Sequence, residues 1–149
     1  MQFEVGSEPV EAEMPVIVGR SGSSRFERIY GNVNAANTWQ PWSEAAVAQS
    51  LAQGHPVFVD FTAAWCVTCQ INKQTTLSQA SVLQSFAEHK VQLMRADWTR
   101  RDPAITRALT ALGRSGVPVY VLYAPGRTPV VLSELLSVDK VQQVLRQLP

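Results

Sequence analysis

The stretch that decides the fold runs from Val57 to Lys73 and reads VFVDFTAAWCVTCQINK. A short apolar run, interrupted by Asp60, is followed by small residues and then by a Cys-x-x-Cys pair, Cys66 and Cys69. Helical neighbours at i and i+3 lie about 5–6 Å apart at Cβ, and a disulfide needs Cα atoms roughly 4.4–6.8 Å apart. The spacing therefore predicts a dithiol that opens and closes with little backbone motion. We interpret the rest of the chain as its scaffold.

Length and composition predict one domain with a packed core and an appendage. The chain has 149 residues, of which 46% are hydrophobic and 17% charged. The net charge is +1 without a basic cluster, which argues against nucleic acid and against an anionic membrane surface as partners. No apolar run approaches the roughly 18 residues of a membrane helix. We therefore expect that this fragment itself does not span a membrane.

The N-terminal segment, residues 1–38, is predicted to be a tether or arm, and residues 39–149 a separate domain. Its glutamates, prolines and the stretch GRSGSSR are typical of linkers. Met14–Val18 is either an edge strand or part of a disordered tether, and Phe26–Tyr30 is predicted as a first strand. The start has acidic residues where a signal peptide needs basic ones. The chain is thus expected to be cytosolic or an excised piece of a longer exported protein.

Beyond the arm, strand and helix signals alternate. Strands are predicted at Pro56–Phe61, Val91–Ala96, Val117–Tyr123 and Pro129–Leu132. Helices are predicted to begin at the caps Ser43, Asp102 and Ser137. Another helix is predicted from Val67, with an interruption near Thr75–Ser78 and a continuation capped by Ser78 or Ser81. The order β-α-β-α-β-α-β-β-α predicts an α/β fold with a central mixed sheet flanked by helices.

The two cysteines are predicted to have different roles. The thiolate is the nucleophile of disulfide exchange. Cys66 lies where strand gives way to helix, and the N–H groups and dipole of a helix N-terminus favour an anion by about 0.3–1 kcal/mol. Cys66 should therefore form a mixed disulfide with a partner, and the more buried Cys69 should resolve it. The alternative, two buried structural cysteines, is disfavoured by their position directly after a strand.

No metal site or cofactor is predicted besides the redox-active Cys66–Cys69 disulfide. A structural zinc site needs four ligands. The only other candidates of this kind, His55 and His89, have no ligand spacing to the cysteines. We expect both histidines to lie in loops or at helix ends.

Asp60 is a lone acid in an apolar strand, and burial should raise its pKa. Because Val57, Val59 and Phe61 share one face, Asp60 should point to the other face, toward the helix that carries Cys69. Two interpretations remain open. The carboxyl group takes and returns the proton of the Cys69 thiol, or it is satisfied by backbone N–H groups at the strand end.

Two further sites are candidates for contact with a partner protein. Trp65 directly precedes Cys66 and is either a platform for a docking protein or a lid on the active turn. Val117 and Pro118 open a predicted strand. If their peptide bond were cis, it would expose the backbone of Val117 beside the disulfide, ready to pair with an extended segment.

These features in this order resemble the thioredoxin superfamily: Val59-Asp60-Phe61, then Trp65-Cys66-x-x-Cys69, then Gly116-Val117-Pro118. The resemblance covers residues 40–148. It implies a thioredoxin-like three-layer fold, with Asp60 as the buried acid near the resolving cysteine and Pro118 in cis facing Cys66. The stretch FVDFTAAWCVTC, with WQPWS before it and ELLS near the end, is similar to the C-terminal domain of the DsbD family of membrane thiol:disulfide reductases. Thioredoxins proper usually carry Gly-Pro between the cysteines.

The DsbD resemblance implies a protein-disulfide reductase in the bacterial periplasm, as part of an inner-membrane protein. Such a domain relays electrons from a membrane domain to an N-terminal periplasmic domain, which serves disulfide isomerases and cytochrome c biogenesis. Residues 1–38 would then be the tether from the last membrane helix. Two alternatives remain: a free-standing periplasmic reductant for cytochrome c maturation, and a thioredoxin-like binding or chaperone module with incidental cysteines.

Lys73 departs from this resemblance, because some relatives carry an acid at that place on the active-site helix. There, the acid is thought to keep the nucleophilic thiol protonated. Lys73 lies seven residues after Cys66, two turns along the same helix face. A cation there should favour the Cys66 thiolate; the alternative is a solvated lysine without effect.

Overall fold

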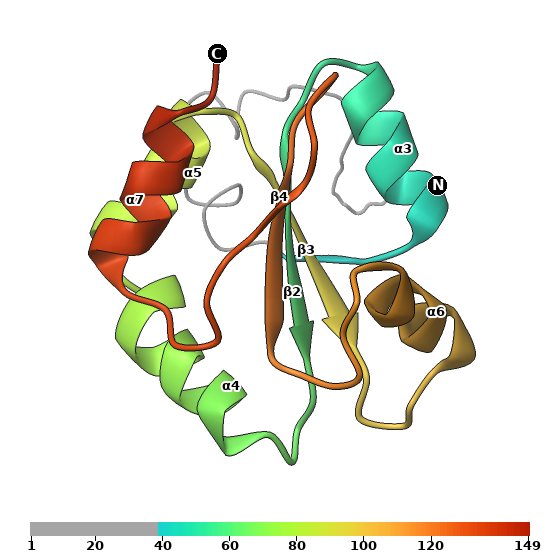
Figure 1. Ribbon diagram of the computed structural model, residues 1–149. Coiled ribbons are helices and arrows are strands. Elements are labelled where there is room, and N and C mark those ends of the chain that lie inside the picture. Colours follow the sequence, from blue (N-terminus) through green and yellow to red (C-terminus); the bar gives the residue numbers. More distant parts are fainter. Residues whose placement is uncertain (1–38) are drawn as a thin grey trace, which may run out of the picture. The chain divides into compact units, whose positions relative to one another are not determined.

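A five-stranded mixed sheet organises the computed structural model, which describes residues 39–149 (Figure 1). The strand order is β1-β3-β2-β4-β5. The strands are β1 (Gln40–Pro41), β2 (Val57–Thr62), β3 (Gln92–Asp97), β4 (Val119–Tyr123) and β5 (Val130–Val131). β1 and β2 run parallel to β3, whereas β4 runs antiparallel to both β2 and β5. The predicted mixed sheet is confirmed.

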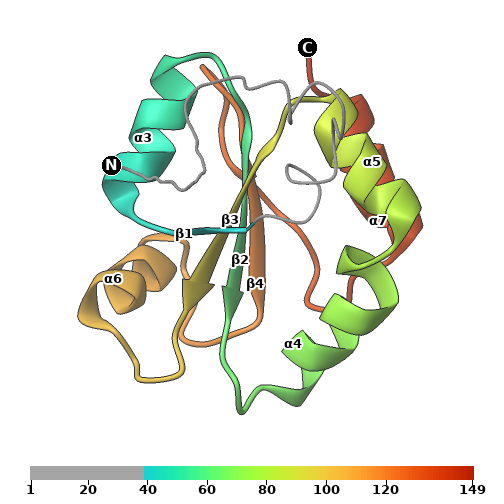
Figure 2. The same ribbon diagram turned by 180° about the vertical axis from the view of Figure 1, so that it is seen from behind.

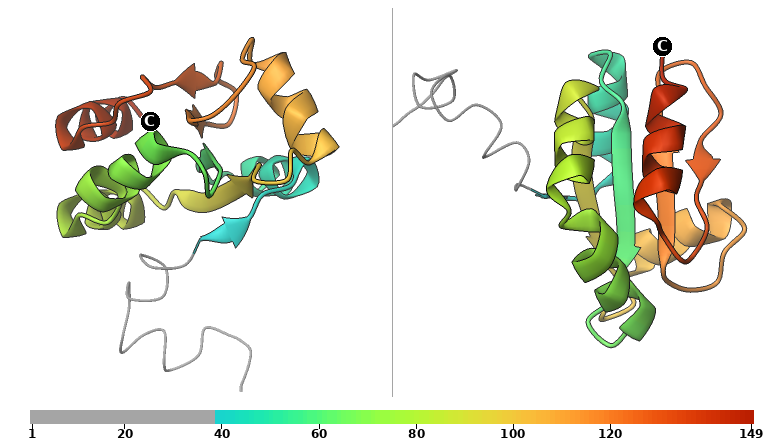
Figure 3. Two further views of the ribbon diagram at one scale, coloured as in Figure 1. Left: turned by 90° about the horizontal axis from the view of Figure 1, so that it is seen from below. Right: turned by 90° about the vertical axis from the view of Figure 1, so that its left-hand side faces the viewer.

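Helices cover both faces of the sheet (Figures 1 and 2). One face carries α3 (Glu44–Ala52) and α6 (Pro103–Ala111). The other face carries α4 (Val67–Asn72), the π-helix η1 (Lys73–Leu77), α5 (Ala80–Glu88) and α7 (Val138–Arg146). Seen from below in Figure 3, the two groups of helices lie on opposite sides of the strands. The fold is therefore the predicted three-layer arrangement.

The alternation of side chains along β2 divides the core into two clusters. Val57, Val59 and Phe61 pack on one face with residues of α3 and α6. Phe58 packs on the other with Phe86 of α5 and with residues of η1 and α7. Every residue of β2 is buried, as expected for a central strand covered on both faces. Such burial fixes the register of β2, because a slip by one residue would exchange the two faces.

The helix caps follow the sequence signals with one exception. Ser43, Asp102 and Ser137 each accept a hydrogen bond from a backbone N–H in the first turn of α3, α6 and α7. The predicted cap of α5 was wrong. Its N-cap is Gln79, which makes no side-chain capping bond. The predicted interruption near Thr75–Ser78 takes the form of η1, after which the chain turns into α5.

The strand predictions need small corrections. The residues between Trp39 and Trp42 form β1, which the sequence had not indicated as a strand. β4 begins at Val119 rather than Val117, because a proline has no N–H to donate to a neighbouring strand. The strands predicted at Met14–Val18 and Phe26–Tyr30 lie outside the described residues. Among residues 39–149, no helix has the length and apolar character to cross a membrane.

Candidate functional site

The cysteine pair lies where β2 gives way to α4. The chain leaves β2 at Thr62 and turns through Ala63, whose carbonyl accepts a hydrogen bond from the Cys66 N–H. Cys66 is the N-cap of α4, with extended backbone, and its Sγ accepts a hydrogen bond from the Cys69 N–H at 3.2 Å. The position predicted for Cys66, at a helix N-terminus, is confirmed. Thiolate at this place would be stabilised by the same N–H group.

Cys66 and Cys69 form a disulfide with a Cα–Cα distance of 5.2 Å. This distance lies within the range that a disulfide requires, so the predicted pairing is geometrically sound. The two residues differ in exposure: 7% of Cys66 is accessible and none of Cys69. Of the two cysteines, Cys66 is therefore the one that an approaching thiolate can reach. The asymmetry matches the different roles that the sequence predicts for the two cysteines.

Val117, directly before Pro118, packs against the disulfide. It contacts the small cluster of Ala63, Cys66 and Cys69. Its peptide bond to Pro118 is cis, as the family resemblance implied. Val117 is half-buried, whereas Pro118 is buried. Of these two predicted contact residues, Val117 is thus the one that a partner could reach.

Asp60 is buried in the sheet on the face of α4, as predicted, with no exposed surface. Its Oδ2 accepts a hydrogen bond from Arg95 Nε at 3.0 Å, and Arg95 is its register partner on β3. Its Oδ1 has no hydrogen-bond partner within the described residues. The alternative of backbone N–H partners for Asp60 was therefore wrong. Burial raises the pKa of Asp60, and the charges of Arg95 and Lys73 oppose this rise.

Lys73 lies at the start of η1 and points at the end of β2. Its Nζ donates a hydrogen bond to Thr62 Oγ1 at 2.5 Å. Burial lowers the pKa of Lys73, and the negative charge of Asp60 works in the opposite direction. The alternative of a freely solvated lysine was wrong, since the side chain is half-buried. The structure thus brings Lys73 to the Asp60 side of the sheet, and no hydrogen bond within the described residues joins it to Cys66.

The loop after β3 holds the segment that precedes Cys66. Thr99 Oγ1 accepts a hydrogen bond from the Ala64 N–H at 2.8 Å, and the Thr99 carbonyl accepts one from Trp65 Nε1 at 3.1 Å. Trp65 remains 49% exposed. The hydrogen bond at Nε1 fixes the Trp65 ring beside the active turn, as expected for a lid. The exposed half of its surface is open to a docking protein, as expected for a platform. Sequence reasoning missed Thr99 because nothing in its neighbourhood marks a contact 35 residues away.

A buried amide anchors the active-site helix. Asn72, at the end of α4, donates to Tyr120 Oη and to the Glu134 carbonyl, both at 2.8 Å, and accepts from the Leu136 N–H at 3.1 Å. Burial raises the pKa of Tyr120, and the nearby Asp60 charge adds to this rise. Tyr120, the register partner of Asp60 on β4, therefore stays a neutral phenol that is hydrogen-bonded to Asn72.

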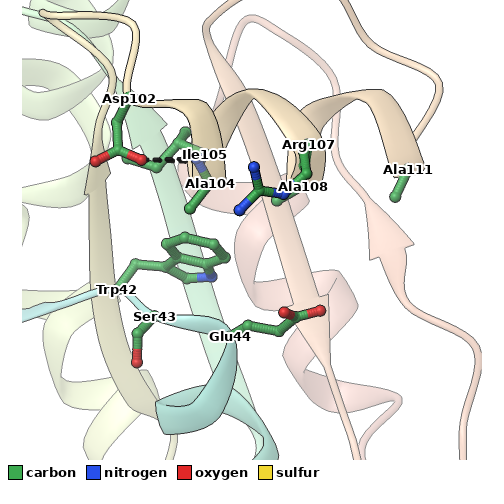
Figure 4. Close-up of a pocket in the computed structure, with 9 residues that line it drawn as sticks. All are labelled: Trp42, Ser43, Glu44, Asp102, Ala104, Ile105, Arg107, Ala108 and Ala111. Carbon is green, nitrogen blue, oxygen red and sulfur yellow. Dashed lines mark hydrogen bonds between the residues drawn. The ribbon is translucent and has the colours of Figure 1, made fainter.

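A hollow of about 350 Å³ lies on the opposite face, between the start of α3 and α6 (Figure 4). Trp42 and Glu44 border it from one side, and Arg107 reaches over it from α6. None of the predicted site residues lines this hollow. Within residues 39–149, no group of His, Cys, Asp or Glu is arranged to hold a metal ion. The reactive chemistry of the described residues is thus concentrated at the disulfide.

Comparison with known proteins agrees with this geometry. A family described as thioredoxin-like matches residues 38–125. The thiol:disulfide interchange protein DsbD 1 of Pseudomonas aeruginosa is 30% identical over 83 residues, which cover 56% of this chain and 14% of that protein. DsbD of a Pseudomonas sp. is 37% identical over 120 residues, which cover 69% of this chain and 20% of that protein. The chain thus spans a fifth or less of these relatives.

Solved structures give the same fold. The C-terminal domain of Neisseria meningitidis DsbD in its reduced form superimposes with a TM-score of 0.60 and 25% identity, covering 70% of this chain and 91% of that domain. The oxidised form gives a TM-score of 0.63 with 23% identity, covering 74% and 98%. The expected thioredoxin-like fold is confirmed.

Proposed function

The chain belongs to the thioredoxin-like family, as a domain of the DsbD type, and on this premise we propose that it reduces protein disulfides by dithiol–disulfide exchange. The observation that carries the proposal is the disulfide at the start of α4, with Cys66 partly accessible and Cys69 enclosed. The names of the relatives, thiol:disulfide interchange proteins, support the same chemistry.

The proposed reaction has two exchange steps. In the dithiol form, the Cys66 thiolate attacks one sulfur of a partner disulfide, a mixed disulfide forms, and the other partner sulfur leaves as a thiolate that takes up a proton. The Cys69 thiolate then attacks Cys66 Sγ, which releases the second partner thiolate. The partner gains two electrons and two protons, and Cys66–Cys69 becomes a disulfide. To start another cycle, the Cys66–Cys69 disulfide must be reduced again. A second dithiol supplies the two electrons by the same two exchange steps in reverse.

Asp60 is proposed to accept the Cys69 proton in the second step. Its Oδ1 is buried without a hydrogen-bond partner in the described residues, and its pKa is raised by burial. A carboxyl group of this kind changes its charge nearer to neutral pH than an ordinary aspartate. Asp60 is the register partner of Tyr120, which belongs to the core on the face of the active-site helix, and this placement supports the role.

We propose that Trp65 and Val117 contact the partner protein, whereas Pro118, the third contact predicted from the sequence, is buried next to Val117. Trp65 precedes Cys66 with half of its surface exposed, and Val117 packs on the cysteine pair. A partner segment lying over Cys66 would touch both. An extended segment that pairs with the backbone at Val117 would place its own disulfide against Cys66 Sγ.

The proposed physiological role follows the DsbD resemblance. We propose a periplasmic domain of a bacterial inner-membrane protein that passes electrons from the membrane domain to other periplasmic thiol–disulfide proteins. These include the remaining domains of the same reductase. The length of the relatives, at least five times that of the matched region, leaves room for such domains.

Insulin reduction tests the activity directly. The dithiol form should reduce insulin disulfides, and Cys66→Ser should abolish this reduction. Cys69→Ser should instead accumulate a mixed disulfide through Cys66, visible as an added mass. Equal turnover by the wild type and Cys66→Ser would overturn the proposal and favour a binding module with incidental cysteines.

A further inference from the structure

Arg101 stands out among the charged residues near the disulfide because two tryptophan rings hold it. Its guanidinium carbon lies 5.1 Å from the Trp65 ring centroid and 4.8 Å from that of Trp98. The two rings contact each other at 6.0 Å between centroids. Both guanidinium distances lie within the range of a cation–π interaction. The side chain of Arg101 is therefore oriented beside the residue that precedes Cys66.

The backbone of Arg101 indicates that its side chain matters. Its φ is +55°, in the left-handed region, where glycine and asparagine are favoured and most other residues are strained. The Arg101 N–H closes this turn on the Trp98 carbonyl at 2.9 Å. A residue other than glycine is held in an unfavourable backbone conformation at this position. The stacking on two rings offsets this cost.

The guanidinium has no anionic partner within residues 39–149. The nearest acids along the chain are engaged elsewhere: Asp97 accepts from the Thr99 N–H and hydroxyl, and Asp102 accepts from two N–H groups of α6. The ion pair between Arg95 and Asp60 is the one salt bridge of the described chain. Arg101 is exposed. A guanidinium that stacks on aromatic rings keeps N–H donors available at the edge of its own plane. The fork of these donors matches the two oxygens of a carboxylate.

We propose that Arg101, held by Trp65 and Trp98, binds a carboxylate on the partner segment that carries the exchanged cysteine. The partner class is a protein or peptide disulfide with an acidic residue close to the cysteine. This inference rests on the proposed exchange function and adds a preference among its substrates. Because Trp65 directly precedes Cys66, the carboxylate and the attacked sulfur would be bound on neighbouring parts of the same surface.

The test compares two symmetrical peptide disulfides, identical except that Glu or Gln stands near the cysteine. Each reacts with the full chain carrying Cys69→Ser, and the formation of the mixed disulfide on Cys66 is followed by mass. With Arg101 present, the mixed disulfide should form faster with the Glu peptide than with the Gln peptide. In Arg101→Asn, the ratio of the two rates should fall by about two- to fivefold, the range of an exposed ion pair. Because the same two peptides are used with each variant, a change in the ratio of rates does not depend on the intrinsic reactivity of either peptide.

The choice of variants separates recognition from folding. Asparagine suits the left-handed backbone at position 101, so Arg101→Asn should fold. Arg101→Lys keeps the charge without the fork and should retain only part of the preference. The matched control is Arg100→Asn, which removes a neighbouring exposed arginine that takes no part in the two cation–π pairs, and it should leave the ratio unchanged.

The outcomes are distinct. Two results would overturn this inference while leaving the exchange function intact. One is a preference for the Glu peptide that is as large in Arg101→Asn as with Arg101 present, and the other is no preference for the Glu peptide when Arg101 is present. An equal loss in Arg100→Asn would also overturn it, since general charge would then explain the effect. Failure of both peptides to react with Cys66 would contradict the proposed function itself.

Discussion

At the residue scale, the buried carboxylate of Asp60 has two cationic neighbours, Arg95 and Lys73. Arg95 binds Asp60 directly, and Lys73 approaches from the active-site helix. The sequence predicted a buried Asp60 because an acid interrupts an apolar strand. It did not predict Arg95, because strand register, which pairs the two residues, cannot be read from either strand alone.

Removing the carboxylate should change how stability depends on pH. Because the pKa of Asp60 is higher in the folded chain than its ordinary value of 3.8, the folded state binds this proton more tightly than the unfolded state. The free energy of unfolding therefore falls as pH rises from about 4 through the folded pKa. Asp60→Asn should remove this fall, so its free energy of unfolding should exceed that of the wild type at neutral pH.

Urea unfolding over a series of pH values measures the effect. Arg95 is 31% exposed, so its charge can be hydrated when Asp60 is gone. The difference between wild type and Asp60→Asn should vanish in acid, where Asp60 is protonated in both states. A constant difference at all pH values would contradict the assigned cause.

Reversing the charge at Lys73 should act on the nucleophile. The Lys73 ammonium is half-buried near Asp60, where the positive potential stabilises a thiolate on the adjoining helix. Lys73→Glu should therefore raise the pKa of Cys66. Lys73→Gln, which keeps a donor for Thr62 but removes the charge, should raise it less. The ultraviolet absorbance of the thiolate, titrated in the reduced protein, measures both, and an unchanged titration in Lys73→Glu would reject the coupling.

At the scale of elements, α4 and the loop before α7 are joined by one side chain. Asn72 binds three partners, on β4 and on the loop of Glu134 and Leu136. The sequence predicted the start of α4, its approximate end and the interruption after it. It did not predict that the interruption is a π-helix or that Asn72 is buried, because both depend on packing against β4 and the later loop.

Asn72→Ala should therefore be strongly destabilising. The change leaves the Leu136 N–H and the Tyr120 hydroxyl without a partner inside the protein. Losses of this kind cost about 2–4 kcal/mol together. Urea unfolding measures the change, with Gln74→Ala as the control on the exposed side of η1. A loss below about 0.5 kcal/mol, typical of surface substitutions, would show that Asn72 does not anchor the helix.

At the scale of the whole molecule, the described residues contain two complete cores, one on each face of the sheet. The order of elements was enough to predict the α/β class, because alternating strands and helices imply a parallel sheet and the closing hairpin implies an antiparallel edge. The short edge strand β1 was missed, since two residues carry no periodicity. The hydrogen bond between Trp65 and Thr99 could not be predicted either, because it joins residues far apart in the sequence.

A chain that begins at Thr38 should fold by itself. The two cores are built from residues of this part, and contacts among residues Thr38–Pro149 define one compact unit. The shortened chain should unfold in a single cooperative transition and still reduce insulin. Absence of a cooperative transition would mean that the cores need residues 1–37 to form.

The two faces of the sheet are chemically unequal. Asp60, Asn72 and Lys73 all belong to the face of α4 and η1, whereas the opposite core, between α3 and α6, is built from hydrophobic and aromatic side chains. Attachment of the protein to a support through α3, which lies on the face opposite α4, would therefore leave the face of the active-site helix uncovered.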